Sequence, residues 1–432
     1  MSPLSVKDAK AYAGNFPKFS QPTEIACFSR DSGRKISFDR SSLRPYRVPR
    51  LPAALDEGFE SYVPRNSEGE EAPLGPILDA LVRQNIKPAA GSFITYRNNL
   101  NKIFATPYSP RDDWEVDVER REDGVILLGV RDTDRKKAEE ANRDERQQRM
   151  SYWGYRFEQL ATLTDAEAAA HASTIGNAAS SGNPASDKYR VPSPSDVGSF
   201  DHLYPPDELA TLRERYSEPF ASEAPQKPAA AAGQALPPVN ANEEFCSIVQ
   251  LSIEKVKLLM AAEIDCVADK APSGAAASAP GAPVAKGYVE LKTSKIMSSQ
   301  RDTENFERHK LLKFWLQSFL AGVPSVIVGF RDEGGQVREL KTYETKTIHR
   351  LVRGKARDGG NHWDPTVCFN FGKAVLEWLL GEVGSGGAAK YVMRYDPQQQ
   401  AVKLQKEGAA AAASTGEDGP PDAKRQRHSE FE

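Results

Sequence analysis

The chain has 432 residues, of which 39% are hydrophobic and 27% charged, and its formal net charge is −3. This length and composition are typical of a soluble globular protein with one large domain or two ordinary ones. The charge excludes a basic field over the whole surface, so any nucleic-acid site must be a local patch. The four cysteines form neither a CxxC pair nor a Cys/His cluster, which argues against structural zinc: Cys27, Cys246, Cys266 and Cys368.

The N-terminus lacks the apolar core of a signal peptide, and no apolar run approaches the roughly 20 residues of a membrane helix. We therefore expect an intracellular protein with no membrane partner. Residues 1–21 read as loosely ordered. Apolar spacing predicts a helix over 73–84, and residues 91–108 read as a strand leading into a loop. Residues 114–132 are typical of a hairpin that turns at "EDG", and 151–163 of a helix.

Three low-complexity stretches near 165–190, 222–240 and 270–285 are rich in Ala, Ser or Pro and read as surface insertions. Between and after them the pattern predicts strands, a helix that ends at Gly322, an apolar strand over 323–332, and a last ordered segment near 374–396. Residues 405–432 read as a disordered tail. Because helices and strands alternate irregularly, we predict an α/β fold in one large mixed domain, residues 22–404.

Acidic residues recur in phase on two predicted strands. If "MAAEIDCVAD" is a strand, Glu263 and Asp265 lie on one of its faces. The next strand, "GYVELKTSK", places Glu290 and Lys292 on one face, with Leu291 on the other. Strands joined by a loop tend to be neighbours in a sheet, and long loops are tolerated. We therefore expect these four side chains in one patch.

Three carboxylates in one patch repel one another unless a shared proton, a basic neighbour or a divalent metal offsets the repulsion. Oxygen ligands favour Mg²⁺ or Mn²⁺ over zinc. A lysine beside them can orient a water or stabilise charge on a phosphate. The pattern thus indicates phosphodiester or phosphoanhydride hydrolysis. The alternative is a solvated strand face with an ordinary Glu–Lys pair.

Three further features each have two interpretations: a part of this patch, or an ordinary surface. Glu158 in "GYRFEQL" is a candidate fourth acid or the exposed side of an amphipathic helix. Arg97 in "ITYRNNL" is a phosphate clamp or a surface arginine. Lys310, Lys313 and Gln317 share one polar helical stripe, which is solvated unless it lies over the acids.

The ordered set "TYRNNLNKI", "GYRFE", "EID", "ELK" and "KLLKFWLQSFLAGVP" resembles the DXO-type RNA decapping nuclease family, above all its fungal branch. The resemblance runs from about residue 22 to about residue 400. It implies two sheets with a core similar to D…ExK nucleases. One position departs from the pattern: the usual Trp-Arg-Gly is Tyr96, Arg97 and Asn98 here. Because Asn lacks glycine's close backbone approach, the resemblance leaves substrate preference near this loop open.

The resemblance also implies roles for single residues. Glu158, Asp265, Glu290 and the Leu291 carbonyl would bind divalent metal, Mg²⁺ or Mn²⁺, as two ions. Glu263 would sit beside the metal through water. The expected catalytic set is Glu158, Glu263, Asp265, Glu290, Lys292 and Gln317. The expected substrate-binding set is Tyr96, Arg97, Asn98, Cys246, Glu263, Lys292 and Gln317.

The implied activities are pyrophosphate release from 5′-triphosphate RNA and removal of incomplete or atypical caps, NAD caps included. The implied partners are the RNA 5′ end and the nuclear 5′–3′ exoribonuclease. A basic cluster, "AKRQRH", in the tail supports a nuclear location. Two alternatives remain: a non-catalytic partner that stabilises the exoribonuclease, and a DNA exonuclease of the same superfamily.

Overall fold

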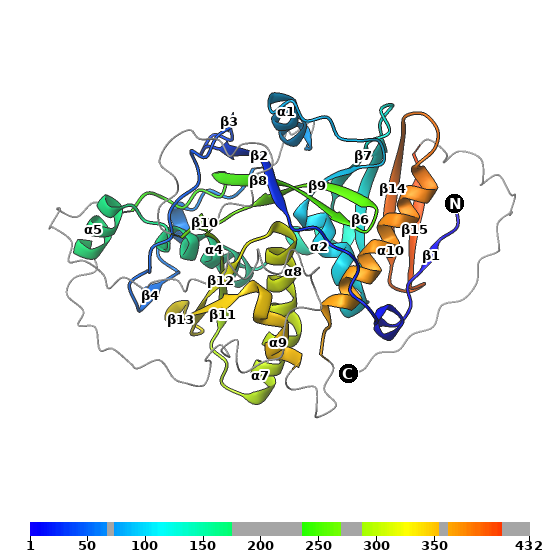
Figure 1. Cartoon of the computed structure of the whole chain (residues 1–432). Helices are drawn as coiled ribbons and strands as arrows, with labels where there is room; N and C mark the ends of the chain where they lie inside the picture. The colour runs from blue at the N-terminus through cyan, green and yellow to red at the C-terminus, as the bar shows by residue number, and fades with distance from the viewer. Residues whose placement is uncertain (67–72, 175–235, 269–286, 354–361, 408–432) are drawn as a thin grey trace, which may run out of the picture.

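Two β-sheets organise the chain in the computed structural model, which describes residues 1–66, 73–174, 236–268, 287–353 and 362–407 (Figure 1). The larger sheet has ten strands in the order β1-β15-β14-β6-β7-β5-β9-β8-β2-β3. In chain order its strands are β1 (Leu4–Ser5), β2 (Thr23–Arg30), β3 (Ile36–Ser37), β5 (Phe93–Tyr96), β6 (Trp114–Arg120), β7 (Ile126–Arg131), β8 (Glu244–Ile253), β9 (Val256–Glu263), β14 (Ala389–Asp396) and β15 (Ala401–Lys406).

The smaller sheet has five strands in the order β10-β11-β12-β13-β4. These strands are β4 (Ala53–Ala54), β10 (Cys266–Val267), β11 (Tyr288–Lys295), β12 (Ser325–Arg331) and β13 (Gln336–Glu344). Strands β11 and β12 pair in parallel, and the other neighbours in this sheet pair antiparallel. The mixed α/β fold with two sheets that the sequence predicts is confirmed.

The helices fill the space between the sheets and cover their outer faces. The α-helices are α1 (Gly75–Arg83), α2 (Arg97–Ala105), α3 (Asp134–Ala141), α4 (Glu145–Leu160), α5 (Asp165–Thr174), α7 (Gln300–Asn305), α8 (Leu311–Ala321), α9 (Ile348–Arg353) and α10 (Pro365–Val383). The shorter helical turns are η1 (Ala9–Tyr12), η2 (Phe59–Ser61), η3 (Thr106–Tyr108), the π-helical turn η6 (Phe306–Lys310) and η7 (Thr345–Thr347).

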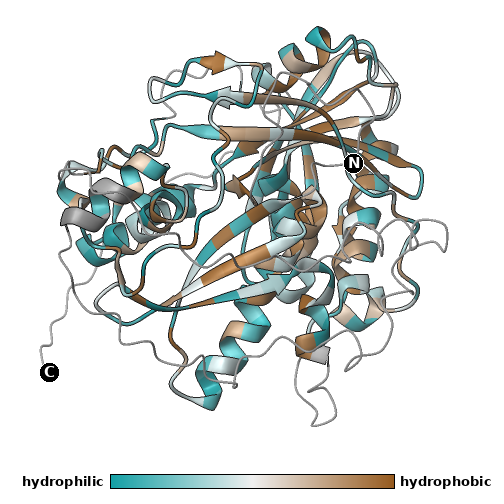
Figure 2. Ribbon diagram, turned by 60° about the vertical axis from the view of Figure 1, so that its left-hand side comes forward, coloured by the Kyte–Doolittle hydropathy of each residue, from teal (hydrophilic) through white to brown (hydrophobic). Residues whose placement is uncertain are grey.

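One continuous core joins the sheets. It combines side chains of α2, α8 and α10, such as Phe104, Trp315 and Val375, with Phe245 of the larger sheet and Val328 of the smaller one. A second core packs α1 on the far face of the larger sheet, and a third packs α4 on the far face of the smaller sheet. Figure 2 shows apolar residues concentrated along the strands and at the centre of the molecule.

Glycines permit the closest approaches between these layers. A side chain at Gly372 of α10 would begin 2.4 Å from the ring of Phe104 on α2. A side chain at Gly329 of β12 would begin 2.8 Å from the ring of Phe157 on α4. Gly322 adopts φ 71° as it ends α8, which confirms the predicted helix end.

Several expectations from the sequence differ from the structure. The N-terminal stretch is anchored at a few points, although most of residues 1–15 are exposed: Leu4 pairs with Val402, and Phe19 is 1% exposed. Their anchors are aromatic, since Phe16 lies 4.8 Å from Phe369 by ring centroids. Isolated aromatic anchors have no period, so a sequence pattern does not reveal them.

Residues 97–105 form helix α2 rather than a loop, because Leu100, Ile103 and Phe104 have helical spacing and are buried. The first predicted insertion begins as helix α5. Its alanines favour a helix, and Thr164 and Glu167 exchange hydrogen bonds at its start. Strand β15 continues to Lys406, beyond the expected start of the tail. The remaining parts of the insertions and of the tail lie outside the described residues.

Candidate functional site

The acid–base pair of β11 forms the centre of the site. Glu290 is fully buried, and the Lys292 ammonium donates to its Oε1. Leu291, between them, packs on the opposite face of the sheet with α4. The predicted sharing of one strand face is therefore confirmed, and so is the opposite placement of Leu291.

Asp265 lies near Glu290, at the point where the chain passes from the larger sheet to the smaller one. Strand β9 of the larger sheet ends at Glu263, and β10 of the smaller sheet begins at Cys266. The prediction of one strand through "EID" is therefore wrong: the chain bends here because the acids lie at the join of two sheets. Asp265 Oδ2 accepts the N–H of Leu291 at 2.7 Å, and Lys292 Nζ lies 3.7 Å from the same oxygen.

Glu158 approaches from the outer side, on helix α4. The preceding residue, Phe157, rests on Gly329 of β12, and Trp153 rests on Gly335, where a side chain would begin 2.8 Å from the indole. These two glycines set how closely α4 approaches the smaller sheet. Helix α4 is amphipathic, and its apolar side in the third core fixes where Glu158 reaches the acids.

The electrostatics show that the carboxylates are close enough to interact. Burial and the neighbouring Asp265 raise the pKa of Glu158 well above its usual value. Burial and Glu290 raise the pKa of Asp265 to about 7. Burial alone would raise the pKa of Glu290, but Arg97 and Lys292 outweigh it and the net shift is downward. The pKa of Lys292 is raised by Glu290 and Asp265 against the opposing effect of burial.

Arg97 is a buried partner of the acids rather than a surface residue. Its Nη1 lies 3.1 Å from Glu290 Oε2 and 3.4 Å from the main-chain carbonyl of Gln317. It is the first residue of α2, directly after β5 ends at Tyr96. The structure therefore brings Arg97, Glu290 and Gln317 together from three elements. Tyr96 is half-buried and Asn98 is exposed on the same turn.

Glu263 lies at the margin of the site and has a partner that the sequence analysis missed. Arg65 Nη1 is 3.4 Å from Glu263 Oε2, and its other terminal nitrogen contacts Glu244. No period or motif surrounds Arg65, so nothing in the sequence marked it. Cys246 lies directly opposite Glu263 in the β8–β9 pair and is 2% exposed. A substrate-lining role for Cys246 stays a prediction.

The donor chemistry fits a divalent cation, although the ligand set is not preassembled. Among the described residues, no three Asp, Glu, His or Cys side chains are placed to hold an ion together. The two oxygens of Glu290 contact Lys292 and Arg97. The raised pKa values of Glu158 and Asp265 reflect burial and like charge, and a bound cation would offset the like charge. Oxygen donors of this kind suit Mg²⁺ or Mn²⁺.

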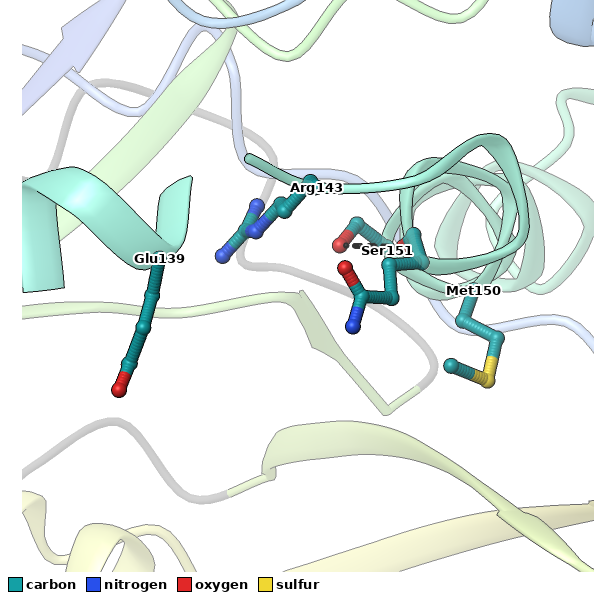
Figure 3. Close-up of a pocket in the computed structure, with 5 residues that line it drawn as sticks. Glu139, Arg143, Met150 and Ser151 are labelled. Carbon is teal, nitrogen blue, oxygen red and sulfur yellow. Dashed lines mark hydrogen bonds between the residues drawn. The ribbon is translucent and has the colours of Figure 1, made fainter. Parts of the chain in front are cut away.

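A surface hollow on α3 and α4 is separate from the acids (Figure 3). It is lined by Glu139, Arg143, Gln147, Met150 and Ser151. The hydroxyl of Ser151 donates to the main-chain carbonyl of Gln147 there, at 3.2 Å, as the dashed line in Figure 3 marks. None of these residues belongs to the predicted site. Among the described helices, none has the length and apolarity to span a bilayer.

Comparison with known proteins gives a consistent match. The family described as RAI1 like PD-(D/E)XK nuclease matches residues 20–191 and 215–421. A decapping nuclease RAI1 from Emericella nidulans is 30% identical over 379 residues, which cover 87% of this chain and 86% of that protein. The sequence similarity therefore extends over nearly the whole chain.

Solved structures match over a similar extent. S. pombe Rai1 in complex with 3′-FADP is 27% identical, with a TM-score of 0.63 over 93% of this chain and 99% of that one. Candida albicans Rai1 in complex with pU5 and Mn²⁺ is 24% identical, with a TM-score of 0.66 over 94% of each chain. The second match supports the shared fold.

Proposed function

Because the chain belongs to the RAI1-like PD-(D/E)XK nuclease family, we propose that it is a metal-dependent hydrolase of RNA 5′ ends. The observation that carries the proposal is the convergence of Glu158, Asp265, Glu290 and Lys292 around β11 of the smaller sheet. Its reactions are pyrophosphate release from 5′-triphosphate RNA and removal of incomplete or atypical caps. The S. pombe relative solved with 3′-FADP supports dinucleotide caps, such as NAD caps, among the substrates.

Glu158, Asp265 and Glu290 would hold the divalent metal, as two ions, with the Leu291 carbonyl as a further ligand. When bound, these cations supply a nucleophilic water at neutral pH and neutralise charge on the phosphate. Glu263 would contact the site through water. To release Glu290 Oε1 for a cation, the Lys292 ammonium would turn from it toward the phosphate or the water.

The other residues orient the reacting groups. Arg97 holds Glu290 at the strand and presents the first turn of α2, with Tyr96 and Asn98, to the RNA 5′ end. Gln317 lies on α8, next to Arg97 of α2, and would contact the reacting phosphate. Contacts to the phosphates rather than to the bases would make the reaction largely independent of sequence.

The test uses the full chain with 5′-triphosphate RNA and Mn²⁺ or Mg²⁺, and measures released pyrophosphate. We expect release by the wild type, none with a chelator, and a loss of at least about 100-fold in Asp265→Asn and Glu290→Gln. Lys87→Gln, far from the acids, is the control. Full activity with chelator, or in both variants, would overturn the proposal. Preference for DNA ends over RNA ends would favour a DNA exonuclease.

We also propose that the protein binds the nuclear 5′–3′ exoribonuclease and acts in the nucleus. The similarity to the fungal relatives supports this proposal, as does the basic cluster "AKRQRH" in residues outside the described part. Copurification with the exoribonuclease from nuclear extract is the expected result. If Glu290→Gln abolishes catalysis but not this binding, the two roles are separate. If the wild type binds but never hydrolyses, the partner role alone remains.

A further inference from the structure

A polar stripe on η6 and α8 begins at the acid site. Its members are Lys310, Lys313 and Gln317, the same stripe that the sequence marks as solvated unless it lies over the acids. The main-chain carbonyl of Gln317 accepts from Arg97, which contacts Glu290. At the other end, Lys310 Nζ donates to Ser294 Oγ of β11 at 3.1 Å. Since Ser294 shares a strand face with Glu290, the stripe follows the polar face of β11 away from the acids.

A hollow of about 350 Å³ borders this stripe. Its lining combines η6 and α8 with the end of η3 and the loop that follows it, and includes Tyr108, Arg111, Asp112, His309, Leu312 and Lys313. The side chains of Arg111, His309 and Lys313 are exposed, and Asp112 is the one acid in the lining. Burial lowers the pKa of His309, and so do the neighbouring cations Arg308 and Lys313, while Asp112 opposes them.

Arg111 and Lys313 differ from several other arginines of the protein, which are neutralised by its own carboxylates. Arg131, Arg135 and Arg149 each form ion pairs with two or more carboxylates. For Arg111 and Lys313, by contrast, no ion pair exists within the described part of the chain. Exposed cations that are not neutralised within the protein remain available for an anionic ligand.

The hollow lies further along α8 from the point where Arg97 contacts Gln317. Helix α2 packs against α8, and its Arg97 donates to the main-chain carbonyl of Gln317. The turn η3 follows α2, and its Tyr108 lines the hollow together with Leu312. Gln317 and His309 are eight positions apart, or about 12 Å at the helical rise of 1.5 Å per residue. A single nucleic-acid strand spans this distance in a few nucleotides.

We propose that this hollow binds backbone phosphates of the RNA chain a few nucleotides downstream of the 5′ end. This inference rests on the proposed function and adds to it a second contact with the substrate. Cations around a shallow hollow recognise phosphate charge and not base identity. The consequence is a preference for RNA long enough to reach from the acids to Arg111 and Lys313.

The test compares a long and a short RNA in Lys313→Ala and Arg111→Ala. Binding of a 20-nucleotide 5′-monophosphate RNA is measured by fluorescence polarisation in chelator, over a series of salt concentrations. For single strands, each phosphate contact makes the affinity vary as the salt concentration to the power of about −0.7. Each variant removes one such contact, so its affinity should be about fivefold lower near 0.1 M salt. The slope of log affinity against log salt concentration should become less steep by about 0.7. Hydrolysis of a 5′-triphosphate dinucleotide should keep its kcat/KM.

The control is Lys87→Ala, which removes one exposed lysine from the loop after α1, on the other face of the larger sheet. It should change neither readout. A fall in kcat/KM for the dinucleotide as large as the fall in affinity for the long RNA, no fall in that affinity, or the same fall in Lys87→Ala would each overturn the inference. A wild type that binds long RNA with the expected slopes but hydrolyses no 5′ end would instead refute the proposed function.

Discussion

Arg97 and Glu290 form a buried ion pair, with Nη1 and Oε2 3.1 Å apart and side chains 8% and 0% exposed. The pair joins the start of α2, in the layer between the sheets, to the central strand of the acid site. Glu290 also receives the ammonium of Lys292. A fully buried carboxylate needs such partners, because desolvation of an unpaired charge costs several kcal/mol.

Removing Arg97 should therefore destabilise the fold through Glu290. We expect Arg97→Met to lower the free energy of unfolding by about 3–5 kcal/mol, the usual cost of breaking a buried pair. Because Glu290→Gln removes the stranded charge, the double variant should recover part of that loss. Urea unfolding of the wild type, both single variants and the double variant measures this. Strict additivity would contradict the coupling.

The pH dependence of stability should carry the signature of Asp265. Its carboxyl titrates near 3.9 when unfolded, but at about 7 in the folded chain. Between these values the folded state binds the extra proton, so the metal-free protein should lose stability as pH rises from about 4 to about 7. Burial and Asp265 raise the pKa of Glu158, which acts in the same direction.

Urea unfolding in chelator at several pH values tests this expectation. Asp265→Asn, which cannot titrate, should show a smaller loss of stability over the same range. If stability changed equally with pH in the wild type and the variant, Asp265 would keep an ordinary pKa in the folded protein.

The approach of α4 to the smaller sheet should depend on Gly329. A methyl group there would begin 2.8 Å from the ring of Phe157. We expect Gly329→Ala to cost about 1–3 kcal/mol of folding stability, as overpacking does. Because Glu158 follows Phe157, the variant should also bind Mn²⁺ more weakly in a calorimetric titration.

Gly154→Ala is the matched control, because Gly154 lies on the same helix and has no neighbour within 4 Å of the added carbon. It should be neutral or stabilise α4 by up to about 1 kcal/mol. If both variants behave alike, close packing at Gly329 does not position Glu158.

A second buried network should hold β11 against the larger sheet. The hydroxyl of Tyr288 donates to Glu24 Oε2 at 2.8 Å, and Arg40 contacts both residues. Ser247 of β8 also donates to Glu24. Tyr288→Phe should cost about 1–3 kcal/mol, because it leaves buried polar partners unsatisfied. A double-mutant cycle of Tyr288→Phe with Glu24→Gln, measured by thermal unfolding, should show a coupling energy between the two residues. Zero coupling would refute a shared network.

The local chemistry of the site could be predicted from the sequence. The alternation of "ELK" places Glu290 and Lys292 on one face in any strand, since side-chain direction alternates with a period of two. The helical pattern around Glu158 and the glycine that ends α8 are likewise local features. The metal-ligand roles of these residues stay predictions until metal binding is measured.

The tertiary structure decided what these residues meet. The bend between Glu263 and Asp265 exists because the chain passes from one sheet to the other there, and strand periodicity carries no information about which sheet a strand joins. Arg97 is buried only because α8 and β11 cover it, and Arg65 reaches Glu263 from about 200 residues away along the chain. Such contacts depend on packing between distant segments, whereas the alternation of a strand depends only on its own backbone.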